Sequence, residues 1–173
     1  MVVCFECGGD AVAAVRLEGV ALDECGLCGA LSGDDAAGTR VLLAREAREH
    51  GIDPGIYPLV VALNSIPELQ VVMCDAGDPA GQTWPFVQFA PTSDMPWRGI
   101  ENLVKSLALS ARGEDVHWVI EVEYQSRLVL TLKPRFHRDV SAITSEDVEA
   151  AQSSLERVRV NLEAHMRLSW WRR

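Results

Sequence analysis

Two closely spaced pairs of cysteines constrain the fold of this chain more than any other feature. Cys4 and Cys7 form one C-x2-C pair, Cys25 and Cys28 form a second, and 17 residues separate the two pairs. This spacing is typical of a four-cysteine zinc site. Because each C-x2-C turn presents two thiolates on one side of a tight loop, two such turns complete the tetrahedron that zinc prefers. These four cysteines are therefore the predicted ligands of a structural Zn²⁺ ion.

The residues around the cysteines also fit a zinc ribbon. Glycine follows each pair, at Gly8 and Gly29, where a tight turn needs a positive φ angle. The residues between the pairs surround Glu18-Gly19, which predicts a short hairpin that carries the second pair back to the first. Four protein ligands leave no open position for water or substrate, so we expect a structural metal. Spacing alone does not distinguish zinc from an iron centre with four thiolates.

The first 30 residues carry a family resemblance. Residues 4–31 resemble the short bacterial zinc ribbons grouped as TFIIB-type zinc fingers, which run C-x2-C-G-G, a hairpin with a Gly-Val step, an Asp two residues before the next cysteine, and C-x2-C-G. The chain departs from this pattern at Ala30-Leu31, where many members carry a tryptophan. The resemblance implies a bacterial zinc-finger protein whose ribbon binds nucleic acid or serves as a docking or structural unit. The matching positions are Cys4, Cys7, Gly8, Gly9, Gly19, Val20, Asp23, Cys25, Cys28 and Gly29.

The distribution of charge favours a protein partner over nucleic acid. The formal net charge is −9, and residues 1–35 hold seven acidic side chains but a single basic one, Arg16. A zinc ion held by four thiolates adds a formal charge of about −2, whereas contacts with phosphates need Arg and Lys. Residues 127–173 are mildly basic, with nine Arg or Lys against six acids. We therefore expect the ribbon to dock a protein or to stabilise the chain.

Nothing in the sequence predicts export or membrane insertion. No apolar run approaches the roughly 20 residues that cross a bilayer, and the first residues lack the basic start and apolar core of a signal peptide. Disulfides would need an oxidising compartment, so these features also favour a metal over disulfides. The predicted location is cytoplasmic.

Beyond the ribbon, the hydrophobic pattern predicts an α+β domain. We expect a zinc ribbon over residues 1–33, a polar linker over 34–38 and the domain over 39–173. Helices alternate with about four mostly antiparallel strands, which favours a sheet covered by helices over a doubly wound sheet. The expected helices are 39–51, 53–66, 94–113 and 144–171, and the expected strands are 69–75, 84–91 and a hairpin within 115–134.

Capping residues predict the ends of two of these helices. Thr39 is the predicted N-cap of the first helix, and Gly51 is its predicted end. Thr144 stands three residues before Asp147, which predicts a capping box at the start of the last helix. The apolar stripe of that helix, which we expect to face the core, is Val148, Ala151, Leu155, Val158 and Leu162.

The fifth cysteine, Cys74, is the candidate for active chemistry. It ends a predicted strand and precedes the loop DAGDPAGQ, and loops at strand ends often carry function. With His117 or His137 nearby it could act as a nucleophile, and Asp75 could orient the histidine. We favour a small buried apolar role for Cys74, because no Cys-His geometry can be derived from the sequence. No residue is assigned as catalytic.

The same region shows a second resemblance. LNSIPELQVVMCDAG, followed by WPFVQFAP, is similar to the wybutosine-synthesising methylase-like proteins, which carry a helix, a strand and a Ser-Cys-x-Gly turn. Here Met73 stands in place of the serine, and Gly77 lies one residue late. The functional turn of that family is not reproduced, so no activity is carried over.

Several polar and aromatic segments are candidate surfaces. His117, Glu121 and Glu123 alternate on one face of a predicted strand, and such a face is most often simply solvated. The segment LSWWRR pairs two tryptophans with two arginines, and both residue types are enriched at protein interfaces. The interface candidates are Trp170, Trp171, Arg172 and Arg173, although the tryptophans could equally pack on the domain. A basic run could meet an anion, an acidic partner or, as we favour, the acidic ribbon itself, and it comprises Arg127, Lys133, Arg135 and Arg138.

Together these patterns favour a non-enzymatic interaction or regulatory protein in which a structural zinc ribbon is joined to a protein-binding α+β domain. Its expected partner is a protein, with a second copy of the chain as one option. The alternative is an enzyme or RNA-modifying factor that uses the Cys74 loop, and the third option is a nucleic-acid-binding regulator. We expect about one zinc per chain, and we expect Cys25→Ser to unfold the ribbon and largely to spare residues 39–173.

Overall fold

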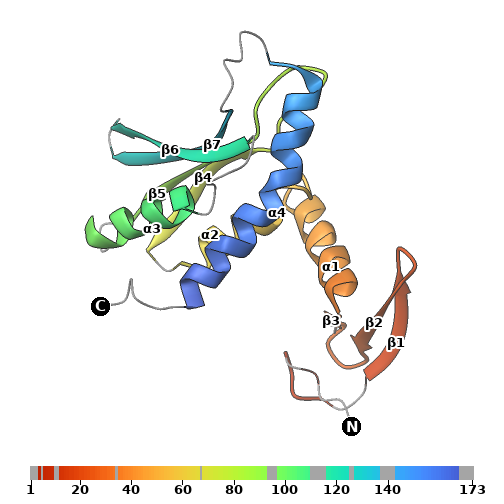
Figure 1. Ribbon diagram of the computed structural model, residues 1–173. Helices are drawn as coiled ribbons and strands as arrows, with labels where there is room; N and C mark the ends of the chain where they lie inside the picture. Colours follow the sequence, from red (N-terminus) through yellow and green to blue (C-terminus); the bar gives the residue numbers. More distant parts are fainter. Residues whose placement is uncertain are drawn as a thin grey trace. The chain divides into compact units, whose positions relative to one another are not determined.

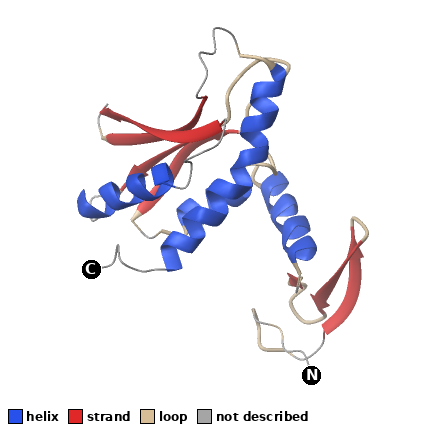
Figure 2. Cartoon of the chain, in the orientation of Figure 1, coloured by secondary structure: helices blue, strands red, loops and turns tan. Residues whose placement is uncertain are grey.

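The computed structural model describes residues 4, 6–9, 12–33, 35–66, 68–92, 97–109, 116–124, 127–136 and 143–167. The chain divides into two compact units, Met1–Pro54 and Gly55–Arg173, which we call the N-terminal unit and the C-terminal unit (Figure 1). Over the described residues, four helices and two antiparallel sheets make up the fold (Figure 2). The predicted α+β class is confirmed.

The N-terminal unit is a three-stranded antiparallel sheet with one helix. Its central strand is β2, which pairs with β1 on one side and with β3 on the other. Glu18 and Gly19 both take positive φ angles, of 51° and 82°, between β1 and β2. Two such residues define the tight turn whose twist matches that of the flanking strands, which confirms the predicted hairpin. The elements are β1 (Val12–Leu17), β2 (Val20–Cys25), β3 (Leu31–Ser32) and α1 (Ala36–Glu49).

Helix α1 packs on β2 and β3, and an unusually close backbone contact joins its first turn to the end of β3. A Cβ atom added to Gly33 would lie 2.7 Å from the Cα of Gly38, and Leu22 lies beside both glycines. At the far end of the helix, Arg48 Nη1 lies 2.7 Å from Glu18 Oε1 at the hairpin turn. The helix begins at Ala36, inside the predicted linker 34–38. It belongs to the N-terminal unit, whereas the sequence predicts it as part of the domain over 39–173.

The sequence predicted the C-terminal end of α1 correctly and its N-cap wrongly. Asp35, and not Thr39, is the N-cap, because its carboxylate accepts a hydrogen bond of 2.6 Å from the Gly38 amide. The predicted cap Thr39 lies inside the helix instead, where its hydroxyl donates to the Asp35 carbonyl. Gly51 does end the helix, with a φ angle of 67° and an amide that donates to the Arg48 carbonyl. Both Asp and Thr are good caps, so local pattern could not choose between them.

The assignment of the cap can be tested with two alanine variants. We expect Asp35→Ala to destabilise the metal-loaded N-terminal unit by about 0.5–2 kcal/mol, because the Gly38 amide loses its acceptor. Thr39→Ala should cost much less, because Thr39 is exposed and makes only a local bond to backbone. The measurement is the protection of α1 amides by hydrogen exchange. Equal losses in the two variants would contradict the assignment.

The C-terminal unit is a four-stranded antiparallel sheet with helices on one face (Figure 1). The strands lie in the order β4-β5-β7-β6, so β4 and β6 form the two edges. Helix α2 packs against β4, and α3 and α4 pack against β6. The elements are α2 (Tyr57–Asn64), β4 (Leu69–Asp75), β5 (Phe86–Pro91), α3 (Trp97–Leu109), β6 (Val116–Tyr124), β7 (Leu128–Phe136) and α4 (Ser145–Arg167).

Most expected elements of this unit are confirmed. The strand over 69–75 has the predicted bounds, and β6 and β7 form the predicted hairpin. The second helix begins at Tyr57 rather than at Asp53, because residues 54–56 form a turn before it. The capping box is also confirmed: the Thr144 amide donates to Asp147 Oδ2 over 3.0 Å, and the Asp147 amide donates to Thr144 Oγ1 over 3.2 Å.

The core lies between the sheet and α4. Trp118 on β6 is 2% exposed, and its indole Nε1 donates a hydrogen bond of 2.7 Å to Ser154 Oγ on α4. That hydroxyl in turn donates to the Ala151 carbonyl, so the buried polar atoms of this contact are satisfied. The predicted stripe of α4 is buried throughout, at Val148, Ala151, Leu155, Val158 and Leu162.

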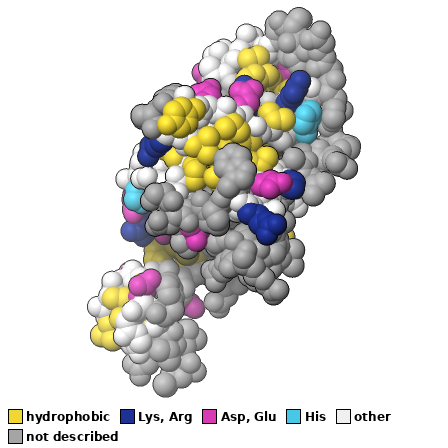
Figure 3. All heavy atoms as spheres, turned by 90° about the vertical axis from the view of Figure 1, so that its left-hand side faces the viewer, with side chains coloured by type: hydrophobic (Ala, Val, Ile, Leu, Met, Phe, Trp, Pro, Cys, Tyr) yellow, Lys and Arg dark blue, Asp and Glu magenta, His cyan; other side chains and the backbone are white. Residues whose placement is uncertain are grey.

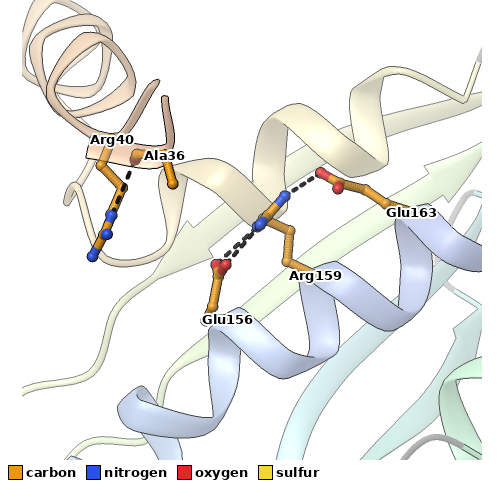
Figure 4. A network of polar contacts seen from close by, with 5 residues as sticks. All are labelled: Ala36, Arg40, Glu156, Arg159 and Glu163. Atoms are coloured by element: carbon orange, nitrogen blue, oxygen red, sulfur yellow. Dashed lines mark hydrogen bonds and ion pairs between the residues drawn. The ribbon is translucent and has the colours of Figure 1, made fainter. Parts of the chain in front are cut away.

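Polar contacts within single helices support α1 and α4. In α1, Arg40 Nε donates to the Ala36 carbonyl over 3.2 Å (Figure 4). In α4, Arg159 lies between Glu156 and Glu163 and contacts both carboxylates (Figure 4). Glu156 and Glu163 raise the pKa of Arg159 above its ordinary value. Each of these contacts joins residues three or four positions apart, so it stabilises its own helix locally.

Candidate metal centre

The two cysteine pairs form turns with the same hydrogen-bond pattern. In the first, the Cys4 amide donates to the Gly9 carbonyl over 2.7 Å, and the Gly8 amide donates to the Cys4 carbonyl over 2.9 Å. Gly8 has a φ angle of 73°, which favours glycine and explains its place after the pair. The second turn repeats both bonds, from Cys25 to Ala30 and from Gly29 to Cys25, with a φ angle of 72° at Gly29.

Strand pairing brings the two turns face to face. The first turn precedes β1 and the second follows directly from β2, and the first residue of β1, Val12, pairs with the last residue of β2, Cys25. Cys4 Sγ lies 3.7 Å from Cys28 Sγ, and Cys7 Sγ lies 3.6 Å from Cys25 Sγ. All four sulfurs lie within 4.8 Å of one another. The structure therefore gathers the four predicted ligands, and no other residue, into this one cluster among the described residues.

The spacing of the sulfurs fits a tetrahedral metal site. Four sulfurs at about 2.3 Å from a central zinc ion would lie about 3.8 Å apart, close to the two printed separations of 3.6 and 3.7 Å. Both separations far exceed the bond of about 2.05 Å in a disulfide. The four thiols could thus hold a metal ion, and all four of its tetrahedral positions would be filled by protein.

Backbone amides point at the sulfurs and prepare them to be thiolates. The Gly9 amide donates to the Cys7 sulfur, and the amides of Cys28 and Leu27 donate to the Cys25 sulfur. Hydrogen bonds to a charged form stabilise it. The Cys28 and Leu27 amides accordingly lower the pKa of Cys25 to about 6, which favours the ionised form that binds metal.

The pKa values of Cys28 and Cys7 are both raised above the ordinary value of a thiol. The Ala30 amide lowers the pKa of Cys28, but the Cys7 thiol, desolvation within the cluster and the other two thiols outweigh it and raise the pKa of Cys28 to about 12. The Gly9 amide and the Cys28 thiol lower the pKa of Cys7, but the Cys25 thiol, desolvation within the cluster and the Cys4 thiol together raise it. Four thiolates gathered at this distance repel one another, and a divalent cation removes that repulsion.

Two cysteines of the cluster are buried and two are exposed, and an exposed leucine lies beside the exposed pair. Cys4 and Cys25 are buried, whereas Cys7 and Cys28 are exposed. Leu27 is 69% exposed, although its Cδ1 lies so close to Gly9 that a Cβ there would sit 2.4 Å from it. Sequence reasoning missed Leu27 as a functional candidate. Its position between the two cysteines of an exposed knuckle was the available signal.

The structure does not bring Cys74 and His117 together. Cys74 lies on β4 and His117 on β6, which are opposite edges of the sheet, about 14 Å apart across three strand spacings. Through β5 and β7, Cys74 is in register with Ile120, three residues from His117, so the two side chains also leave opposite faces. Asp75 accepts a hydrogen bond from the Gly77 amide over 2.7 Å and thus shapes its own loop. His137 lies outside the described residues.

The chemistry of Cys74 can be tested by alkylation. Burial, followed by the charge of Asp75, raises the pKa of the Cys74 thiol. A smaller fraction is therefore thiolate at neutral pH than in a free cysteine, and we expect slow reaction with iodoacetamide at pH 7 that accelerates only above the ordinary thiol pKa. Mass spectrometry of metal-loaded protein measures this. Reaction faster than that of a free cysteine peptide would contradict the structural role.

Of the two candidate surfaces predicted from the sequence, the structure describes part of the basic run and none of the tryptophan–arginine segment. The interface candidates Trp170, Trp171, Arg172 and Arg173 lie outside the described residues. On the sheet, Lys133 Nζ lies 2.6 Å from Glu121 Oε2, so the basic run and the acidic face of β6 partly neutralise each other. Arg127 and Arg135 are exposed, and Arg138 lies outside the described residues.

The chain matches no protein-family model, no curated protein and no solved structure. The two resemblances stated from the sequence therefore stay predictions. Among the described residues, no helix combines the length and the apolar character that a bilayer crossing requires. What the fold itself provides is a closed cluster of four thiols in a small unit that is joined to a larger α+β unit.

Proposed function

We propose that the chain binds one structural zinc ion in its N-terminal unit, as a zinc ribbon, and that it acts as a non-enzymatic interaction protein. The observation that carries the proposal is the cluster of Cys4, Cys7, Cys25 and Cys28, with separations that suit zinc. Zinc is preferred over other divalent ions because it is borderline-soft and accepts four thiolates without a further ligand. A closed site has no position for a substrate, so the metal's role is to hold the ribbon together.

Charge and exposure support a protein partner for the ribbon. Residues 1–54 contain ten carboxylates and four arginines. Two of these arginines already contact carboxylates within the unit, Arg48 with Glu18 and Arg45 with Glu49. Phosphate backbones need free cations, whereas an exposed Leu27 on an acidic unit suits a partner with an apolar, basic surface.

Affinity capture with three variants tests this function. Leu27→Asp removes the exposed apolar side chain and leaves the four ligands, Cys25→Ser removes a ligand, and Val160→Asp is a matched change at an exposed valine of α4. We expect wild type and Val160→Asp to retain the same protein, and both ribbon variants to lose it. Capture that is unchanged in Leu27→Asp would contradict the ribbon as contact surface. Binding of nucleic acid at low salt would contradict the preference for a protein.

A further inference from the structure

Among the described residues, β6 forms a long and regular outer edge of its sheet. In the part of the chain that the structure describes, β6 is an outer strand of its sheet and pairs with β7 continuously from Val116 to Tyr124. Its nine residues, VHWVIEVEY, include neither a proline nor a lysine. The other edge strand, β4, is interrupted by a bulge between Val71 and Met73. Bulges, prolines and charged side chains, lysine above all, are the usual protection of an edge. β4 carries a bulge, whereas β6 carries only the carboxylates of Glu121 and Glu123 and is the edge more open to pairing.

The apolar face of β6 is covered at one end only. Val116 and Trp118 are buried, at the end of the strand where α3 and α4 pack. Val122 and Tyr124 belong to the same face by their alternation, yet they are 57% and 80% exposed. They lie near the tip of the β6–β7 hairpin, and the side of the molecule to which this tip points shows a group of hydrophobic side chains (Figures 1 and 3).

We propose that β6 pairs antiparallel with β6 of a second copy of this chain, across a two-fold axis at Ile120. This register pairs all nine residues of each strand, with Trp118 opposite Val122 and Val116 opposite Tyr124. The exposed half of each apolar face thus meets the covered half of the other, and the two sheets join into one. The proposal goes beyond the role of the ribbon, because it names a partner for the C-terminal unit and does not depend on the metal.

The charges along β6 favour the same register. His117 lies beside Arg135 at one end of the strand, and Glu121 and Glu123 lie at the other end. A two-fold axis at Ile120 places Glu123 of each copy opposite His117 and Glu121 opposite Val119. Moving the axis by one residue, to position 121, would instead place two Glu121 carboxylates opposite each other, which is destabilising. The full-length register therefore brings the acidic end of each copy to the end that carries His117 and keeps the Glu121 carboxylates apart.

Sedimentation equilibrium of the full, zinc-loaded chain tests the pairing. We expect a dimer, and we expect Val122→Lys to weaken it at least about tenfold, because a lysine on an edge strand opposes pairing. Val160→Lys is the matched control, since Val160 is also exposed, at 46%, and belongs to α4 rather than to the edge strand. Chelation of the metal should leave the dimer intact. A monomer at all concentrations, or a dimer that Val122→Lys does not weaken, would overturn the proposal.

A cross-link tests the register independently of affinity. In a Cys74→Ser background, Ile120→Cys would place two cysteines opposite each other, with Cα atoms about 4.5–5.5 Å apart. That separation suits a disulfide, so mild oxidation of the zinc-loaded chain should give a covalent dimer. Val72→Cys, on the opposite edge strand β4, should not. A dimer that Ile120→Cys fails to cross-link, or that Val72→Cys cross-links instead, would show a different interface and overturn the proposal.

Discussion

Loss of the metal is expected to unfold the whole N-terminal unit, including α1, and to leave the C-terminal unit folded. The described residues of the N-terminal unit contain few buried apolar side chains, namely Cys4, Leu22, Cys25 and Ala47. Two of these belong to the thiol cluster, so little core remains without the site. Structural zinc contributes an apparent binding free energy of about 10–16 kcal/mol in small zinc modules, which far exceeds what this core can supply.

Hydrogen exchange of the Cys25→Ser variant measures this effect. Amides of β1, β2 and α1 should lose protection together, because α1 rests on the sheet through Gly33 and Gly38. Amides of β7 and α4 should keep theirs. Cys74→Ser is the control, since it removes a thiol outside the cluster. Continued protection of α1 in Cys25→Ser would show that the helix is stable without the metal, as the boundary at residue 39 predicted from sequence implies.

Replacement of Trp118 is expected to give the largest loss of stability in the C-terminal unit. Trp118→Ala leaves a cavity between β6 and α4 and should cost about 3–5 kcal/mol. Trp118→Phe keeps most of the ring volume but removes the indole donor to Ser154, which should cost about 1–2 kcal/mol. Urea denaturation followed by circular dichroism measures both changes.

Val122→Ala is the matched control on the same strand. Val122 is exposed, so its truncation at concentrations where the chain is monomeric should change the free energy of unfolding by less than about 0.5 kcal/mol. The metal centre should survive in Trp118→Ala, because the cluster lies in the other unit. A Trp118→Ala variant as stable as Val122→Ala would contradict the position of Trp118 in the core.

Local patterns were enough to predict several parts of this fold. The cysteine spacing and the Glu18-Gly19 step define the cluster and its hairpin, because both depend on short-range turn geometry. The strand over 69–75 and the capping box at Thr144 follow from alternation and from a three-residue spacing. In the cysteine turns, the hairpin turn and the capping box, the interactions that decide the local structure lie within a few residues of one another.

Other parts depend on contacts that no local pattern encodes. The place of α1 is decided by the close approach of Gly33 to Gly38. In the sequence, the small and polar residues around this contact indicate a flexible linker instead. The separation of Cys74 from His117 follows from the strand order β4-β5-β7-β6, which places their strands at opposite edges. Strand order is set by tertiary pairing across long sequence distances, so the nucleophile hypothesis could be judged only from the fold.

X-ray absorption at the zinc edge of the purified chain tests the central claim most directly. The geometry of Cys4, Cys7, Cys25 and Cys28 predicts about one zinc per chain with four sulfur neighbours at about 2.3 Å. Substitution of any one of these cysteines should remove a sulfur neighbour or the metal itself, whereas Cys74→Ser should change neither. A chain that carries no zinc, or a zinc with fewer than four sulfur neighbours, would contradict the proposed closed ribbon site.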